Sequence, residues 1–306
     1  MKKLFTLIII AIICFVACGT DGEQVRKKTR AERAEQRRQD SLALKVAVLP
    51  TIDAMPLFVA QERGLFTRLD VDVRLKPYNA QMDVDTALLG GSVEGAMTDL
   101  VRVERMKQQG LSLVCLSSTQ SHWQLIGNRT ARLKEPKQLG DKMVAMTRYS
   151  ATDLLTDEAL KGEKTSAAVY RVQINDVLLR MQMLRNNEMD ALWLPEPHAT
   201  EARLAGHSVL WDTQKKDFRL GVMAFRQKAL ADKRIKEQTD KLLKAYNMAC
   251  DSLNQKGLAA YADIIELYCH TDLTTAKALP KLTFVHAKAP REQDVSAART
   301  WLNAGK

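Results

Sequence analysis

The sequence predicts an α/β protein with mostly parallel sheets. From Leu44 onward, short apolar runs alternate with amphipathic stretches of helical length. Continuous apolar runs are typical of parallel strands that are covered by helices on both faces. The 306 residues are 46% apolar and 27% charged, and this composition excludes collagen-like, disordered and multi-span membrane proteins. The length favours two domains of about 130–150 residues each.

Residues 1–17 predict a secretory signal peptide. Two lysines precede the fourteen uncharged residues Leu4–Ala17, which as a helix would be about 21 Å long, too short for a hydrocarbon core of roughly 30 Å. The tetrapeptide Phe15-Val16-Ala17-Cys18 resembles the lipobox of bacterial lipoproteins, although Leu is usual at its first position. The resemblance implies that Cys18 becomes the first mature residue and is acylated. The alternatives are a signal peptide that happens to contain Cys18 and an uncleaved anchor.

Residues 18–40 predict a charged tether between the lipid and the folded body. From residue 19 the segment holds seven Lys/Arg and five Asp/Glu, with Val25 as its one large apolar residue, so it cannot bury enough surface to fold alone. A solvated helix without a role of its own is the alternative. Its interleaved acids and lack of aromatic residues argue against nucleic-acid binding. The formal net charge of the chain is +10, and the part after the tether keeps a modest excess of about +6, which indicates no particular partner.

The predicted strands are short and lie between residues 45 and 225. In chain order they are Lys45–Leu49, Val71–Leu75, Gly95–Thr98, Leu111–Leu116, Trp123–Gly127, Lys142–Met146, Ala191–Leu194, Ser208–Trp211 and Leu220–Phe225.

Helix ends are predicted from local chemistry. Pro56 near the start and Gly64 past the end delimit the first helix. Ser150 opens a capping box with Asp153, Asn175 begins another helix, and the Glu196-Pro197 pair opens a third. Three further helical segments are predicted in the C-terminal third: Lys228–Leu253 (one or two helices), Leu258–Tyr268 and Asp294–Leu302.

Four motifs together resemble periplasmic solute-binding proteins of the NitT/TauT/SsuA type, also called the NMT1/THI5-like group. They are Met55–Phe66 (MPLFVAQERGLF), Leu88–Asp99 (LLGGSVEGAMTD), Leu139–Ala145 (LGDKMVA) and Asn187–Pro197 (NEMDALWLPEP). Glu94 stands where Asp is usual, Asn187 where Gly is usual, and Gly-Asp-Lys where Lys-Gly-Lys is common. The resemblance covers about residues 44–226.

The resemblance implies a type II periplasmic-binding-protein fold, in which two α/β lobes are joined by two crossing strands, with a helical C-terminal part. Lobe 1 would comprise residues 41–119 plus 217–306, and lobe 2 residues 120–216. The implied function is that of a non-enzymatic substrate-binding component of an ABC importer. It would be a monomer in the bacterial cell envelope, lipid-anchored and facing the periplasm or the outer surface. It would deliver a small organic or oxyanion solute to a membrane permease.

Polar residues follow several predicted strands, at the position where open α/β sheets bind ligands near helix N-termini. The candidate ligand-binding residues are Asp53, Ala54, Thr98, Asp99, Ser118, Thr147, Ser150, Thr152 and Glu196. Asp53 and Ser150 suit helix caps equally well, Thr98-Asp99 suits a loop, and Glu196 suits a surface turn. Four more side chains have a binding and a structural alternative: Trp123 and Trp193 as stacking platforms or core, and Arg102 and Arg148 as anion partners or solvated arginines.

The sequence predicts no metal, cofactor or catalytic group. The five histidines lack metal-ligand spacing, and no GxSxG, P-loop or GxGxxG motif occurs. Cys115 is expected to be a buried free thiol, and a Cys250–Cys269 disulfide stays open. Two other functions also stay open: an enzyme related to pyrimidine (thiamine-precursor) synthases, and an interaction lipoprotein that has lost its ligand.

Overall fold

The structure is a computed structural model that describes Glu32, Glu35 and residues 42–305. The predicted signal peptide, Cys18 and most of the tether lie outside the described residues. The chain divides into two units, Met1–Ala43 and Leu44–Lys306, and the architecture below is that of the second unit. None of the helices in the described part of the chain is long and apolar enough to cross a membrane.

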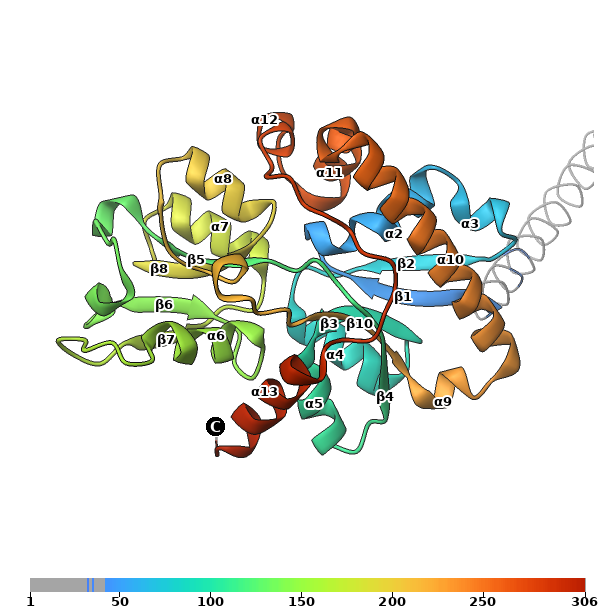
Figure 1. Cartoon of the computed structure of the whole chain (residues 1–306), viewed down its shortest axis with the longest axis horizontal. Coiled ribbons are helices and arrows are strands. Elements are labelled where there is room, and N and C mark those ends of the chain that lie inside the picture. The colour runs from blue at the N-terminus through green and yellow to red at the C-terminus, as the bar shows by residue number, and fades with distance from the viewer. Residues whose placement is uncertain (1–31, 33–34, 36–41, 306) are drawn as a thin grey trace, which may run out of the picture. The chain divides into compact units, whose positions relative to one another are not determined.

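The described strands form two five-stranded sheets (Figure 1). The first sheet contains β1 (Leu44–Val48), β2 (Val73–Pro77), β3 (Gly95–Asp99), β4 (Leu113–Ser118) and β10 (Gly221–Arg226). The second contains β5 (Trp123–Gly127), β6 (Met143–Met146), β7 (Tyr170–Gln173), β8 (Ala191–Pro195) and β9 (Ser208–Asp212). We call the first sheet with its helices lobe 1 and the second sheet with its helices lobe 2.

The two sheets have equivalent topologies. Lobe 1 has the strand order β2-β1-β3-β10-β4, and lobe 2 has the order β7-β6-β8-β5-β9. In each sheet the first three strands are parallel, and the fourth runs antiparallel to its neighbours. The parallel strands therefore end at one edge of each sheet, where the loops that follow them gather.

Helices cover both faces of each sheet. Those of lobe 1 are α2 (Met55–Glu62), α3 (Leu65–Arg68), α4 (Gln81–Gly90), α5 (Leu100–Gln108), α9 (Gln227–Leu230), α10 (Lys233–Lys256), α11 (Ala262–Cys269), α12 (Leu273–Lys277) and α13 (Glu292–Asn303). Those of lobe 2 are α6 (Ala151–Leu160), α7 (Val177–Arg185) and α8 (His198–Leu204). Short 3₁₀ turns are η1 (Ile52–Ala54), η2 (Arg129–Ala131), η3 (Pro136–Leu139), η4 (Gln214–Lys216) and η5 (Leu258–Tyr261).

The core follows the alternation of strand side chains between the two faces of a sheet. In β3, Met97 packs in the cluster that contains α2, α10 and α11, whereas Ala96 packs in the cluster that contains α4 and α5. The second cluster continues into lobe 2, where it includes Trp193 of β8 and Leu154 of α6. The two lobes are therefore in apolar contact in this arrangement.

Two segments, residues 119–122 and 213–220, carry the chain between the sheets. The N–H of Thr119 donates to the carbonyl of Gly221 over 2.9 Å, and the N–H of Thr213 donates to the carbonyl of Trp123 over 3.1 Å. These bonds anchor the first segment at its lobe 1 end and the second segment at its lobe 2 end.

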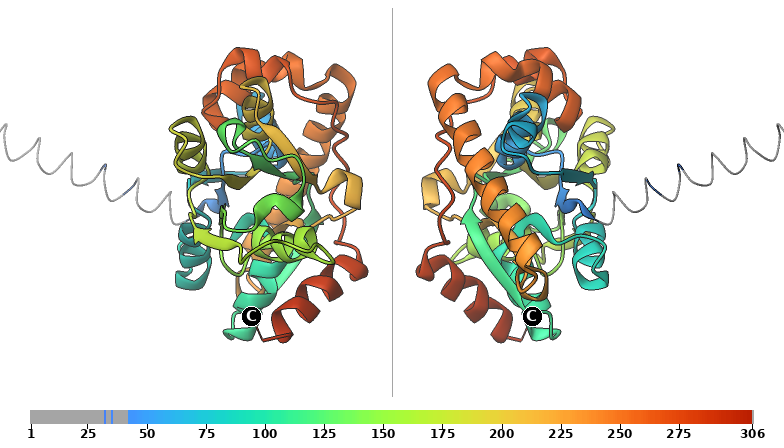
Figure 2. Two further views of the ribbon diagram at one scale, coloured as in Figure 1. Left: turned by 90° about the vertical axis from the view of Figure 1, so that its left-hand side faces the viewer. Right: turned by 90° about the vertical axis from the view of Figure 1, so that its right-hand side faces the viewer.

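The C-terminal part passes the crossing region and ends on lobe 1. The carbonyl of Lys288 accepts from the N–H of Ser118 over 2.7 Å, and α13 then packs beside α5 (Figures 1 and 2). Arg299 pairs with Glu104 of α5 over 3.0 Å. The same helix also contacts α6 of lobe 2.

The prediction of α/β architecture is confirmed, with local differences. The strand β7 was missed because Tyr170–Gln173 is a half-exposed edge strand with little apolar character. Helix α7 is capped by Asp176 and not by Asn175, since the Asp176 side chain accepts from the N–H groups of Leu178 and Leu179. Among the described residues, Cys115, Cys250 and Cys269 are free thiols.

Candidate functional site

A cavity of about 60 Å³ lies between the two lobes. Six of the nine sequence-predicted binding residues line it: Asp53, Thr98, Asp99, Thr147, Ser150 and Thr152. The first three come from lobe 1 and the last three from lobe 2. The cavity is small, and part of it is open to solvent.

The other three predicted residues do not line this cavity. Ala54 is fully buried before α2. Ser118 borders a separate cavity of about 360 Å³ beside the crossing segments. The Glu196 carboxylate is directed into lobe 2, where Thr200 and Arg203 of α8 donate to it. Only its backbone reaches lobe 1, with the carbonyl accepting from the N–H of Ile52 over 3.0 Å.

Asp53 is held by hydroxyl groups. Its carboxylate accepts from Thr51 over 2.5 Å, from Ser121 over 2.6 Å and from Thr119 over 3.4 Å. Thr119 and Ser121 belong to the first crossing segment. Asp53 therefore ties the end of β1 to the hinge and does not act as a helix cap, since the N-cap of α2 has no side-chain bond.

Thr98 and Asp99 end β3 at the floor of the cavity. The Thr98 hydroxyl accepts from Gln81 Nε2 over 3.1 Å. Asp99 caps α5 by accepting from the N–H of Arg102 over 2.9 Å. Burial raises the pKa of Asp99 to about 7, and the backbone N–H groups of Arg102, Ala151 and Val101 offset only part of that effect.

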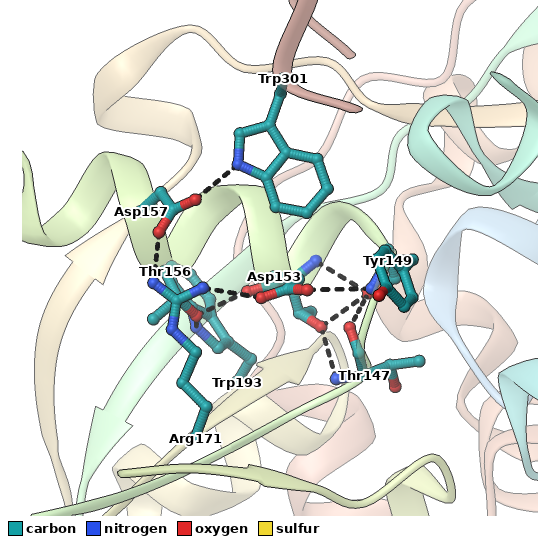
Figure 3. Close-up of polar contacts among 10 residues, drawn as sticks. Thr147, Tyr149, Asp153, Thr156, Asp157, Arg171, Trp193 and Trp301 are labelled. Atoms are coloured by element: carbon teal, nitrogen blue, oxygen red, sulfur yellow. Dashed lines mark hydrogen bonds and ion pairs between the residues drawn. The ribbon is translucent and has the colours of Figure 1, made fainter. Parts of the chain in front are cut away.

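The lobe 2 wall is the first turn of α6 with the loop before it (Figure 3). Ser150 caps the helix by accepting from the N–H of Thr152 over 3.1 Å, and its hydroxyl donates to the Thr147 carbonyl over 2.7 Å. Thr147 N–H donates to Thr152 Oγ1 over 2.9 Å. Ser150 therefore both caps α6 and lines the cavity, because the capped turn itself faces the cavity.

Two acidic residues of α6 hold this loop in place, Asp153 in the first turn and Asp157 one turn further along. Asp153 accepts from the N–H of Tyr149 over 2.9 Å and from Arg171 of β7 over 2.8 Å. Arg171 also pairs with Asp157, which accepts from Trp301 of α13 over 2.6 Å (Figure 3). Trp193 donates to Thr156 over 2.8 Å and is fully buried, so it belongs to the core. Trp123, by contrast, lines the cavity.

Sequence reasoning missed Arg180 and the amide side chains of Asn79, Gln81 and Asn175, which also line the cavity. Arg180 lies in α7 and is 4% exposed. It donates to the carbonyls of Ile174 over 2.7 Å and Trp193 over 2.9 Å, and to Thr147 Oγ1 over 2.5 Å. Burial lowers the pKa of Arg180 to about 10. Arg180 lies among apolar residues in the sequence of α7, so no local pattern marked it as a binding residue.

Polar contacts close the cleft around the cavity. The N–H of Val177 donates to the carbonyl of Asn79 over 3.3 Å. Arg102 is 2% exposed, forms an ion pair with Asp85 and donates to the carbonyl of Arg148 over 3.1 Å. Arg102 is therefore neither a solvated side chain nor a free anion partner. For Arg148, both alternatives from the sequence stay open: a partner for an anion and a solvated arginine.

The cavity wall is mostly apolar, with Met97, Trp123 and Val177 among its residues, and it carries a limited number of polar groups. Hydroxyl, amide and carboxylate groups from two lobes surround a small volume, an arrangement that orients a compact solute by hydrogen bonds. Within the described residues, no group of three or more His, Cys, Asp or Glu side chains is placed to hold a metal ion.

Solved structures with this fold include solute-binding proteins. A ligand-binding component of an ABC-type import system from Staphylococcus aureus superposes with a TM-score of 0.71 and 16% identity, covering 86% of this chain and 92% of that chain. The alkanesulfonate-binding protein SsuA from Xanthomonas axonopodis pv. citri gives a TM-score of 0.71 and 13% identity over 86% and 91% of the two chains. The nitrate-binding protein NrtA from Synechocystis PCC 6803 gives 0.67 and 16% over 76% and 68%.

Sequence comparison leads to the same group. No curated protein sequence matches this chain. A family model described as "NMT1/THI5 like" matches residues 51–253, which is more than half of the chain. This match begins just before η1 and ends within α10, and it includes both crossing segments and all the residues that line the cavity except Leu49. The chain belongs to the NMT1/THI5-like family and has the type II periplasmic-binding-protein fold.

Proposed function

We propose that this protein is the substrate-binding component of an ABC importer. The observation that carries the proposal is the cavity to which both lobes contribute polar residues, with Thr98 and Asp99 from one lobe and Thr147 and Ser150 from the other. A solute held by both lobes stabilises the closed arrangement over the open one, because only the closed arrangement offers all the contacts.

The proposed mechanism uses residues 41–119 plus 217–306 and residues 120–216 as the two moving lobes. Rotation about the crossing segments opens the cleft, the solute binds, and closure presents both lobes to a membrane permease. The role is binding without chemical conversion. The printed names of the structural neighbours support it, since they describe an import component, an alkanesulfonate-binding protein and a nitrate-binding protein.

The protein is proposed to act as a lipid-anchored monomer on the outer side of a bacterial membrane. Cys18 directly follows a small-residue cleavage site, so it is the expected acylation site. In a Cys18→Ser variant, the protein should no longer incorporate a labelled fatty acid or fractionate as a mature membrane-bound lipoprotein. Normal acyl labelling of that variant contradicts the anchor.

A thermal-shift screen over small organic acids, amines, oxyanions and pyrimidines tests the binding role, followed by calorimetry with the best solute. Thr98→Ala or Ser150→Ala should weaken binding by about 0.5–1.5 kcal/mol for each lost neutral hydrogen bond. Ser118→Ala is the control, because Ser118 borders the other cavity. If all three substitutions leave the affinity unchanged, the site assignment is wrong.

A further inference from the structure

Three ionisable side chains line the cleft: Asp53 and Asp99 from lobe 1 and Arg180 from lobe 2. With both acids ionised, their formal charges sum to −1. The Asp53 carboxylate already accepts from three hydroxyl groups. Arg180 already donates to two carbonyls and one hydroxyl. Both of these groups are thus engaged by neighbouring protein atoms.

Asp99 differs from the other two. Its side chain is 4% exposed, and the groups that stabilise its charge are backbone N–H groups. Among the residues that the structure describes, no Lys, Arg or His side chain forms an ion pair with it, since the nearby Arg102 pairs with Asp85 instead. A buried carboxylate is normally paired with a cation or takes up a proton. A cationic group that enters the cleft with a solute would supply Asp99 with the partner that the protein does not.

The position of Asp99 also disfavours a solute whose only charge is negative. One of the N–H groups that stabilises its charge belongs to Ala151, the first residue of α6 in the other lobe. Helix N-termini attract anions, but at α6 the protein supplies its own carboxylate. An anionic solute placed there would face Asp99 at close range in a site of low dielectric.

We propose that Asp99 determines the charge of the solute: the cleft takes a small molecule that presents a positively charged nitrogen to Asp99, and it discriminates against the same molecule without that nitrogen. This inference rests on the proposed function, because it concerns the same cleft. It assigns to Asp99 a role in specificity beyond capping α5.

Calorimetry on the full mature protein at pH 8 tests the proposal with two matched pairs of probes. β-Alanine is compared with propionate, and ethanolamine with ethylene glycol, so that each pair differs in the presence of an ammonium group. The variant is Asp99→Asn, which preserves the helix cap since Asn and Asp cap equally well. The control is Asp232→Asn, because Asp232 caps α10 by accepting from Ile235 N–H and does not line the cleft.

In the wild type and in Asp232→Asn, the ammonium member of each pair should bind at least about 10-fold more tightly, as expected for a charged hydrogen bond. In Asp99→Asn this preference should fall to about 2-fold or less, and propionate should bind more tightly than it does to the wild type. Equal affinity within both pairs for the wild type, including no binding of any probe, overturns the proposal. So does an ammonium preference that survives in Asp99→Asn.

The charge preference assigned to Asp99 and the proposed binding function are contradicted by different results. If a solute from the broader screen binds with an affinity that depends on Thr98 and Ser150 but not on Asp99 or on an ammonium group, the charge inference fails and the binding function stands. If no solute class binds to the wild type at all, the proposed function fails together with the inference.

Discussion

The indole Nε1 of Trp301 donates to Asp157 Oδ2 over 2.6 Å (Figure 3). This bond joins the C-terminal helix of lobe 1 to lobe 2. Trp301 lies in α13, which packs on α5 of lobe 1, whereas Asp157 lies in α6 of lobe 2. The Asp157 carboxylate also pairs with Arg171, which holds Asp153 and the loop beside the cavity. This bond therefore helps to hold the two lobes together in the arrangement that the structure shows.

Trp301→Phe should weaken solute binding, because the ring is retained while the bond across the lobes is lost. A neutral donor to a carboxylate contributes about 1.5–3 kcal/mol when buried, and partial exposure of Trp301 lowers the expected effect to about 1 kcal/mol, roughly 5-fold in affinity. Calorimetry with the best solute measures it. Gln108→Ala is the control, since its 2.9 Å bond to Asn303 lies within lobe 1. Equal losses in both variants contradict a role in closure.

The contribution of Asp99 to the stability of the ligand-free protein should fall as the pH rises from about 4 to about 7. Burial raises the pKa of Asp99 to about 7 from an ordinary value of 3.8, so the folded state binds its proton more tightly than the unfolded state does. That stabilisation is complete below the unfolded pKa and is lost as the pH passes the folded one. One pKa unit corresponds to about 1.4 kcal/mol.

Urea unfolding at pH 5 and pH 8 tests this linkage. The wild type should lose on the order of 1–4 kcal/mol more than Asp99→Asn between the two pH values. The charged groups on the surrounding elements are all retained in the variant. They include Asp53 of η1, Asp85 of α4, Arg102, Glu104 and Arg105 of α5, Arg148 before α6, Asp153 within α6 and Arg180 of α7. If the free energy of unfolding changes equally with pH in the wild type and in Asp99→Asn, the raised pKa of Asp99 is contradicted.

Gly221→Ala should disturb the hinge. A Cβ atom at Gly221 would lie 2.1 Å from Ser121 Oγ and 2.5 Å from Thr119 Oγ1, the hydroxyls that hold Asp53. We expect destabilisation of about 1–3 kcal/mol from overpacking. Gly90→Ala is the matched control, because nothing lies within 4 Å of its Cβ position and alanine favours the helix. If Gly221→Ala has the same melting temperature as Gly90→Ala, the close approach of Gly221 to Ser121 and Thr119 is contradicted.

Arg180→Lys should destabilise the protein and weaken binding although the charge is retained. A single ammonium group cannot reach the carbonyls of Ile174 and Trp193 and the hydroxyl of Thr147 in the geometry of the guanidinium. Leaving one or two buried acceptors unpaired costs about 1–3 kcal/mol each. Urea unfolding and calorimetry measure the two effects. If Arg180→Lys unfolds at the same urea concentration as the wild type, the three hydrogen bonds of Arg180 do not have the stabilising role proposed here.

Most of the strands and helices could be predicted from the sequence, because short-range periodicity and end signals are local properties. The strand Trp123–Gly127 was placed with the bounds that the structure has. Ser150 caps α6 as predicted, but the capping box with Asp153 does not form, because Asp153 accepts from the N–H of Tyr149. The edge strand β7 escaped prediction, since an edge strand needs little apolar surface and draws its stability from pairing with β6. Chain neighbours alone do not reveal such pairing.

The candidate site was only partly predictable for the same reason. Thr98 and Ser150 follow strands whose carboxyl ends must lie at one edge of a sheet, so the sequence alone places them near a ligand edge in each lobe. Arg180 and Asn79 reach the cavity only because α7 and the end of β2 meet across the lobes. Glu196 satisfied the same sequence rule as Thr98, but contacts with Thr200 and Arg203 direct its side chain away.

Residue periodicity and motifs within a dozen residues are local features of the chain. They were enough to predict the two α/β lobes, the family and the loops from which a ligand would be held. Which side chains share one cavity, and which of them lack a cation partner, depends on contacts between distant segments. In the sequence, Asp99 suits either a binding residue or a loop. In the structure it is a buried acid without a cation partner, because the nearby Arg102 is bound to Asp85.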